Sequence, residues 1–484
     1  MCGALQSTNI HLQADERRPD KNDKRGLRAL ANRMLASVAT FEQCFQTKSA
    51  NSLDLATRYV SGLLTQTLRK NMERMDERLG EEPGLGEDSY QSLQQFISAS
   101  PWEEAALYSG ISQRASGRLG GRPGSTLVID ESGHSKKGRA SAGVARQWNG
   151  RLGKQDNCQV GVHSVLNCGP HSAMIGTRLF LPDEWIEEPD RCRAVGAPEA
   201  RIAQGARTKI QLARELIEEA VANGVQFACV SLDAFYGRDS GLRRSIQEQG
   251  LVYCADVPAN ARVFGQAPEL ESRPEKITGH TFTVEELARR MTGDKPHPGQ
   301  RMTLREGENG IVETHVWARR VWEWPAGQPQ PEELCLIVRA MPDGTLKTSL
   351  SNAGARTSLK RLARWQAGRF YVERSFQDAK SHCGMSEYQA RGWRAWHHHM
   401  ALVSLALLFL MEERLLNPLE MPLLSAADVV ELMEWALVKR PTEDEMLERV
   451  HRRHAQRALN GRNAVARQRR KSRARKPHQR SAYT

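Results

Sequence analysis

Apolar residues recur every three or four positions in the first third of the chain, which is the period of an amphipathic helix. Two such stretches cover residues 27–45 and 53–75. A third helix is expected from Ser100, which can cap it, with a proline in the first turn and a glutamate that can close a capping box. The Gly-rich segment 117–124 ends this pattern. We therefore predict an all-helical N-terminal domain over residues 1–120.

After Gly124 the pattern changes to short apolar runs of strand length, separated by one long helical stretch and one shorter helix. Strands are expected at 126–130, 158–166, 173–181, 227–232 and 251–255, with the long helix at 202–222. Strands that alternate with helices in this way predict an α/β domain with a mixed sheet. Its first part would cover residues 121–261.

Residues 262–353 form a β-rich segment with Pro- and Gly-rich turns, and helices return after it. Strands are expected at 311–322, 334–340 and 346–350, and helices at 358–380 and 393–416. We interpret the β-rich segment as an insertion, because the sequence on either side contributes residues to one site. The second part of the α/β domain would then cover 354–420, followed by a helical segment at 421–450.

The composition is that of a soluble, multidomain protein, with 484 residues, 39% apolar and 26% charged. The longest apolar run, Met400–Met411, is shorter than the ~18 residues of a membrane helix. No apolar signal-peptide core follows the first residues. The nine cysteines are scattered without a C-x-x-C pair. We therefore expect a cytoplasmic protein with no membrane partner, no disulfide framework and no zinc finger.

The positive charge is concentrated at one end of the chain. Residues 451–484 hold twelve Lys and Arg and no acid, so the other 57 basic residues balance the 57 acidic ones, and the net charge of +12 lies in this tail. Such a block predicts a disordered tail that binds a polyanion. Nucleic acid is favoured over a membrane surface, because the tail lacks apolar residues to insert. Arg469, Arg470 and Lys471 are candidate contacts.

Two acids stand at the carboxyl ends of predicted strands, Asp130 and Asp233. Ligands of α/β sheets bind at that edge, although one such aspartate alone is usually a turn residue. A third acid, Glu373, shares a helix face with Arg369 and Lys380. The alternative is a solvated helix with an Arg–Glu pair worth a few tenths of a kcal/mol.

The order of these residues resembles the DDE insertion-sequence transposases. Arg369, Glu373 and Lys380 have the spacing of the R-(3)-E-(6)-K part of the family's Y-(2)-R-(3)-E-(6)-K signature. The segments 128–138 and 232–237 match the blocks around the first and second catalytic aspartates.

The resemblance implies a ribonuclease-H-like catalytic domain with a β insertion between the second aspartate and the glutamate. It also implies two Mg²⁺ ions, for which Mn²⁺ can substitute, with Asp130 bridging them and Asp233 and Glu373 each completing one site. Paired ions activate a nucleophile and stabilise the leaving oxygen, and carboxylates are the ligands that Mg²⁺ prefers. Arg369 and Lys380 would contact phosphates beside the scissile bond.

The implied activity is cleavage of transposon ends and joining of their 3′-hydroxyls to target DNA. The partners would be double-stranded terminal inverted repeats, target DNA and a second copy of the chain, with residues 1–120 serving end binding or dimer contacts. Gln366 stands where the signature has its tyrosine. Trp322 and Trp324 are typical of core or edge-strand aromatics, and the alternative is that one stacks on a base flipped from the transposon end.

Other functions stay open at this stage. One is a domesticated, non-catalytic DNA-binding relative, and another is a ribonuclease-H-like nuclease that acts in repair or on RNA. The three intact acids favour an enzyme over a binding protein, and the helical N-terminal part and β insertion argue against the nuclease. His397–His399 are expected at a wet helix end, and Asp256 is expected to be a surface or turn acid.

Deleting residues 451–484 is expected to remove sequence-independent DNA affinity. Each lost phosphate contact reduces the slope of log affinity against log salt concentration by about 0.9. If half of the twelve basic residues contact phosphates, the deletion reduces the slope by roughly 5. Titrations of full-length and truncated protein across salt concentrations measure this. Equal slopes would assign the tail to assembly or solubility instead.

Overall fold

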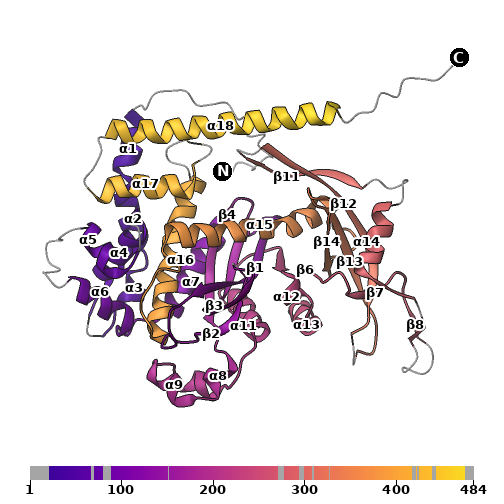
Figure 1. The fold of residues 1–484 in the computed structure, drawn as a ribbon, viewed down its shortest axis with the longest axis horizontal. Helices are drawn as coiled ribbons and strands as arrows, with labels where there is room; N and C mark the ends of the chain where they lie inside the picture. Colours follow the sequence, from indigo (N-terminus) through magenta and orange to yellow (C-terminus); the bar gives the residue numbers. More distant parts are fainter. Residues whose placement is uncertain are drawn as a thin grey trace.

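The computed structural model describes residues 21–48, 50–66, 70–79, 89–150, 152–270, 277–278, 280–293, 299–307, 310–325, 328–416, 421, 424–438 and 443–474. Seven helices make up the N-terminal part (Figure 1). They are α1 (Lys21–Arg28), α2 (Leu30–Ala39), α3 (Glu42–Phe45), α4 (Leu53–Leu63), α5 (Met72–Leu79), α6 (Ser89–Ser98) and α7 (Glu104–Leu119).

Two of the helices predicted for this part are divided by turns that the spacing of apolar residues does not reveal. The stretch 27–45 is divided among α1, α2 and α3, and the stretch 53–75 is divided between α4 and α5, which pack against each other. Both halves bury their apolar residues in one core, so the period continues across each turn. The third helix begins at Glu104, with no side-chain cap from Glu103.

A mixed sheet follows, as expected for a ribonuclease-H-like domain. Its strands are β1 (Ser125–Ser135), β2 (Ala145–Asn149), β3 (Lys154–Cys168), β4 (His171–Leu179), β5 (Cys229–Leu232) and β6 (Tyr253–Asp256). β1, β5 and β6 are neighbours and run parallel, whereas β3 pairs antiparallel with β1 and also with β2 and β4. The parallel strands place their carboxyl ends at one edge of the sheet.

The β-rich insertion was expected to be a separate β unit, but most of its strands continue this sheet. Its strands are β7 (Arg262–Phe264), β8 (Glu269–Leu270), β9 (Ile277–Thr278), β10 (Thr281–Thr283), β11 (Gln300–Gly307), β12 (Gly310–Glu323), β13 (Glu332–Ala340) and β14 (Leu346–Ser351). β8 and β9 alone among its described strands form a two-stranded sheet of their own. β14 pairs antiparallel with β6, with Leu350 opposite Ala255. This pairing covers the edge of β6 that would otherwise leave backbone donors and acceptors unpaired.

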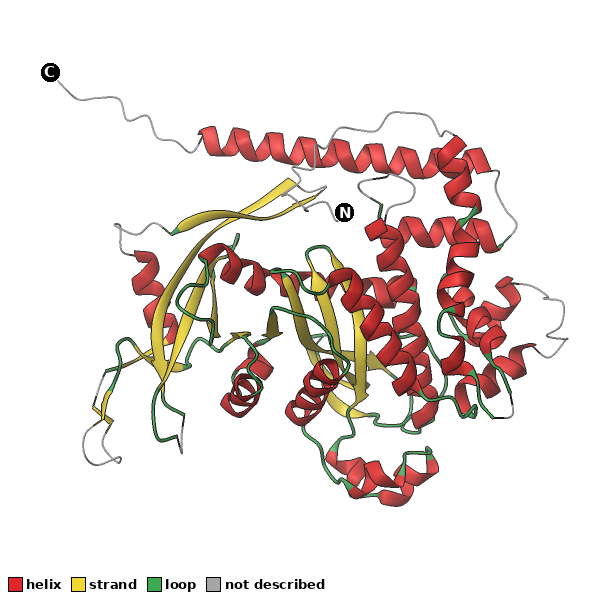
Figure 2. Cartoon of the chain, turned by 180° about the vertical axis from the view of Figure 1, so that it is seen from behind, coloured by secondary structure: helices red, strands yellow, loops and turns green. Residues whose placement is uncertain are grey.

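The remaining helices flank the sheet and the insertion (Figures 1 and 2). They are α8 (Asp183–Ile186), α9 (Pro189–Ala194), α10 (Glu199–Ala203), α11 (Lys209–Ala222), α12 (Ala234–Gly237), α13 (Ser240–Glu248), α14 (Val284–Gly293), α15 (Leu359–His382), α16 (Trp393–Leu416), α17 (Ala426–Leu437) and α18 (Glu443–Ala474). α15 carries the predicted glutamate. None of the helices in the described ranges is long and apolar enough to cross a membrane.

α16 is the buried axis that joins the N-terminal helices to the sheet. It contacts β4 on one side and α4, α6 and α7 on the other. Near its C-terminal end, Glu412 forms ion pairs with Arg114 and Arg118, and Glu413 pairs with Arg33 at 2.7 Å. The N-terminal helices therefore share one hydrophobic core with the α/β part.

The expectation of a wet helix end at His397–His399 is wrong. All three residues are at most 5% exposed, and N-terminal residues from α4, α6 and the segment before α7 contact this turn of α16. His399 Nδ1 lies 2.8 Å from the Tyr59 hydroxyl, and His398 lies between the carbonyl oxygens of Ile97 and Trp102.

The basic segment is helical as far as Ala474, which corrects the expectation of a disordered tail; residues 475–484 lie outside the described residues. Its long basic side chains are good helix formers. Leu447, His451, His454 and Ala458 supply a buried face at helical spacing. α18 also touches the insertion, where Gln468 Nε2 donates to the Ile311 carbonyl oxygen at 2.9 Å. A truncation that begins at Arg462 therefore separates loss of charge from loss of this face.

The buried histidines predict that the protein loses stability in mild acid. Burial lowers the pKa of His163 and of His399 to about 3 and the pKa of His397 to about 4. Each group thus gains a proton near pH 6.5 only when unfolded, so stability is complete above 6.5 and falls below it, by up to about 1.4 kcal/mol per pH unit per histidine. Urea denaturation of wild type and His399→Gln between pH 7.5 and 5 measures the slope.

The His399→Gln variant is expected to be less steeply acid-sensitive than wild type, and the exposed His315→Gln is the matched control with an unchanged slope. Identical slopes for all three proteins would contradict the assignment of neutral buried histidines.

Candidate active site

The three predicted acids line one cleft of about 560 Å³ at the carboxyl edge of the parallel strands. Asp130 lies on β1, Asp233 stands between β5 and α12, and Glu373 projects from α15. Arg369 and Lys380 line the same cleft. The structure thus brings together residues that are 103 and 140 positions apart in the chain.

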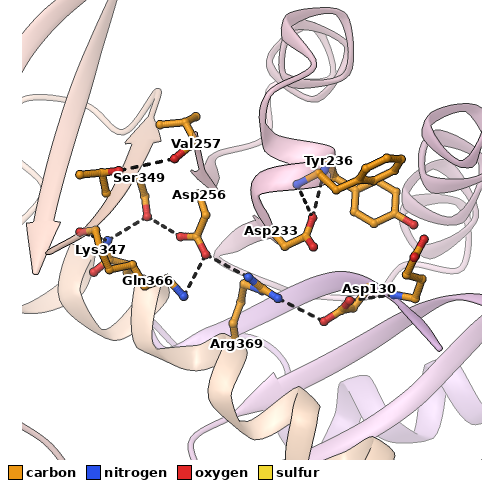
Figure 3. A network of polar contacts seen from close by, with 12 residues as sticks. Asp130, Asp233, Tyr236, Asp256, Val257, Lys347, Ser349, Gln366 and Arg369 are labelled. Carbon is orange, nitrogen blue, oxygen red and sulfur yellow. Dashed lines mark hydrogen bonds and ion pairs between the residues drawn. The ribbon is translucent and has the colours of Figure 1, made fainter. Parts of the chain in front are cut away.

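Asp233 is held in place as the N-cap of α12. Its Oδ1 accepts from the backbone N–H groups of Phe235 and Tyr236 at 2.9 and 3.0 Å, as Figure 3 shows. Gly237 ends α12, and a Cβ there would lie 2.1 Å from the Asp256 carbonyl oxygen. The helix can therefore pack onto β6 only with glycine at this position, and that packing fixes the loop that carries Asp233.

α15 approaches the sheet through a second glycine. Ser358 caps the helix, accepting from the Arg361 N–H. Ten residues on, a Cβ at Gly368 would stand 3.3 Å from Thr126 of β1 and from Asn167 of β3. This close contact brings α15 next to β1, where the following residue, Arg369, reaches Asp130.

Arg369 lies between two carboxylates (Figure 3). Its Nη2 donates to Asp130 Oδ2 at 3.2 Å, and its Nη1 donates to Asp256 Oδ2 at 2.9 Å. Burial by itself would lower the pKa of Arg369, but the charges of Asp130, Asp256 and Asp233 together raise it above its ordinary value. Arg369, which was predicted to bind phosphate, thus also balances the negative charge of these aspartates.

Asp130 is a largely buried carboxylate with a raised pKa. Its side chain is 13% exposed, and burial raises its pKa to about 6; Arg369 lowers the pKa and Asp233 raises it. Burial is thus the main cause of the raised pKa of Asp130, and the charge of Arg369 offsets it only in part.

Asp256 is the site residue that the sequence analysis missed. It is 6% exposed and forms ion pairs with Arg369 and with Lys347 Nζ, each at 2.9 Å. Ser349 Oγ donates to it at 2.6 Å and accepts from Gln366 Nε2 at 2.8 Å. The rule that selected the other two aspartates could have found it, because it ends the next parallel strand.

Gln366, at the position of the signature tyrosine, is 1% exposed and belongs to this buried network. Its side chain supports the Asp256 end of the site rather than the cleft surface. Glu131, another acid on the cleft wall, pairs with Lys209 at 2.8 Å.

The tryptophans expected from the insertion do not line the cleft. Trp322 sits on β12 opposite Glu333, and Trp324 Nε1 donates to the Gln328 carbonyl oxygen at 2.8 Å. The aromatic side chains that line the cleft are instead Trp148 and Phe235, which are 54% and 38% exposed, and the buried Phe376. The exposure of the first two could not be deduced from the sequence.

The basic candidates lie on α18. Arg469 and Arg470 are exposed there, and Lys471 belongs to the same helix, although its side chain lies outside the described residues. Arg469 and Arg470 do not line the cleft.

The chain belongs to the DDE superfamily endonucleases, because residues 40–322, more than half of it, match that family. The matched span contains Asp130 and Asp233 and ends before Glu373. One curated relative is the "probable transposase for insertion sequence element IS701" of Microchaete diplosiphon. It is 34% identical over 156 residues, which cover 32% of this chain and 36% of the relative.

Enzymes of this superfamily generally use divalent metal ions. Within the described ranges, no three His, Cys, Asp or Glu side chains are grouped closely enough to hold an ion. One Asp130 oxygen accepts from Arg369 instead, and the other accepts from the Glu131 N–H at 2.8 Å. The donor chemistry fits, because the cleft offers the carboxylate oxygens of Asp130, Asp233 and Glu373, the kind of ligand that Mg²⁺ prefers.

Proposed function

We propose that the protein is a DNA transposase that cleaves the ends of an insertion sequence and joins their 3′-hydroxyls to target DNA. The observation that supports this most is that carboxylates from β1, the β5–α12 junction and α15 line one cleft beside two basic side chains. Membership of the DDE superfamily and the likeness to a transposase point the same way.

The proposed ligands of two Mg²⁺ ions are Asp130, Asp233 and Glu373, and Mn²⁺ would substitute. When bound, such a pair activates the attacking oxygen and stabilises the departing one. The protein's own contribution is to hold the three carboxylates at one sheet edge, with Asp233 fixed as a helix cap. Arg369 and Lys380 would bind the phosphates on either side of the scissile bond, since both line the same cleft.

The DNA would be double-stranded, comprising terminal inverted repeats and target, and two copies of the chain would pair the two ends. The exposed arginines of α18 would add contacts to the phosphate backbone. We expect the protein to be found with the bacterial nucleoid, where its substrate lies. The domain boundaries at residues 120, 261, 353 and 420 are part of this proposal, whereas α18 runs across the boundary expected at 450.

The main alternative is a DNA-binding relative without catalysis. A binding protein gains nothing from acidic side chains that face a polyanion, and the cost of burying Asp130 beside Asp233 would have no return. The cleft therefore favours the enzyme.

Replacing a proposed metal ligand is expected to abolish cleavage without abolishing DNA binding. Asp130→Asn, Asp233→Asn and Glu373→Gln should each reduce end cleavage by more than about a hundredfold, which exceeds the usual effect of losing a residue that only supports a ligand. Gel-based cleavage and binding assays on a labelled end fragment measure both properties.

The matched control is Asp239→Asn, which removes an acid that caps α13 outside the cleft. It should keep cleavage within a few-fold of wild type. Wild-type cleavage by any of the three ligand variants would place the chemistry elsewhere.

The exposed aromatics at the cleft predict a contact with bases. If Trp148 stacks on an unpaired base next to the scissile phosphate, Trp148→Ala should weaken binding of a pre-nicked or splayed end by about 1–3 kcal/mol, and Trp148→Phe should restore most of it. Binding to fully paired DNA serves as the internal control. An equal effect of Trp148→Ala on both substrates would rule out stacking.

A further inference from the structure

Asp130, Asp233 and Asp256 lie on, or directly after, three adjacent parallel strands, and Arg369 is shared by the aspartates of the two outer strands. Strand order places β5 between β1 and β6, so Asp130 and Asp256 flank Asp233. The guanidinium reaches both flanking carboxylates at once, at 3.2 Å to Asp130 and 2.9 Å to Asp256 (Figure 3). The planar guanidinium presents separate N–H donors to the two acids, Nη2 to Asp130 and Nη1 to Asp256.

The two carboxylates differ in how well their charge is satisfied. Asp256 also receives Lys347 Nζ at 2.9 Å and Ser349 Oγ at 2.6 Å. Asp130 has Arg369 and one backbone N–H. Because Arg369 is closer to Asp256, the Asp130 carboxylate keeps part of its charge unbalanced.

We infer that Asp256 is a positioning residue: it draws the Arg369 guanidinium off Asp130 and thereby keeps Asp130 able to bind a divalent cation. The inference rests on the proposed function, because it takes Asp130 to be a metal ligand. Asp256 itself does not line the cleft, and it acts through Arg369.

Removing the charge of Asp256 should turn Arg369 fully onto Asp130. Asp256→Asn, which keeps the shape and can still accept from Ser349, should weaken Mn²⁺ binding to the full-length protein by about 10- to 100-fold, the usual effect of losing a residue that orients a metal ligand. Isothermal titration calorimetry with Mn²⁺ alone, without DNA, measures the affinity. Ser349→Ala removes a neutral hydrogen bond from the same carboxylate and should change the affinity by less than about threefold.

The double variant Asp256→Asn with Arg369→Ala separates positioning from direct ligation. Without Arg369 there is no competitor for Asp130, so the double variant should bind Mn²⁺ as tightly as Arg369→Ala does. If Asp256→Asn weakens binding equally in both backgrounds, Asp256 is itself a ligand and the inference is overturned. An unchanged affinity of Asp256→Asn overturns it as well.

A second variant tests the inference in the opposite direction, should Asp256→Asn fold poorly. Lys347 is 28% exposed in its side chain, so Lys347→Gln is expected to fold. In this variant Arg369 alone balances the charge of Asp256, so the Arg369–Asp256 pair becomes stronger. Because Arg369 is then held further from Asp130, Mn²⁺ binding should tighten by about two- to fivefold. Weaker or equal binding would contradict the inference.

Asp130→Asn keeps this test distinct from a failure of the proposed function. If Asp130→Asn binds Mn²⁺ as wild type does, the proposed metal site is wrong. If it abolishes binding while Asp256→Asn and Lys347→Gln leave the affinity unchanged, the site stands and the positioning role falls.

Discussion

The interaction on which this structure depends is the sharing of Arg369 between Asp130 and Asp256. Parallel β1, β5 and β6 gather three aspartates at one sheet edge, and like charges so close would repel each other strongly in a partly buried cleft. Arg369 lies on the neighbouring helix α15, and its positive charge offsets this repulsion. The position of α15 on the sheet, and with it the place of Glu373, is therefore coupled to the electrostatics of the strand ends.

The rest of the fold can be understood as support for that edge. Gly237 lets the loop of Asp233 pack against β6, and Gly368 lets α15 lie close to β1 and β3. β14 covers the outer edge of β6 and supplies Lys347 and Ser349 to Asp256. The insertion is thus more than an appended unit, because it completes the buried polar network behind the cleft.

Much of this could be predicted from the sequence because it follows from local rules. Strand ends identified Asp130 and Asp233, and helical spacing with the signature identified Glu373 beside Arg369. The missing parts depend on tertiary contacts. Asp256 also ends a strand, but its ion pair with Arg369 becomes visible only once β6 and α15 are placed in the fold. The buried face of α18, from Leu447 to Ala458, is hidden by the charge around it, and the burial of His397–His399 requires the N-terminal helices.

The most direct test of the account is a crystal structure of the full chain soaked in Mn²⁺, with anomalous scattering used to locate the ion. The account predicts a peak in the cleft within coordination distance, about 2.0–2.3 Å, of Asp130 and of Asp233 or Glu373, with the Arg369 guanidinium moved from Asp130 toward Asp256. A peak away from all three carboxylates, in crystals where Mn²⁺ is bound at full occupancy, would contradict it.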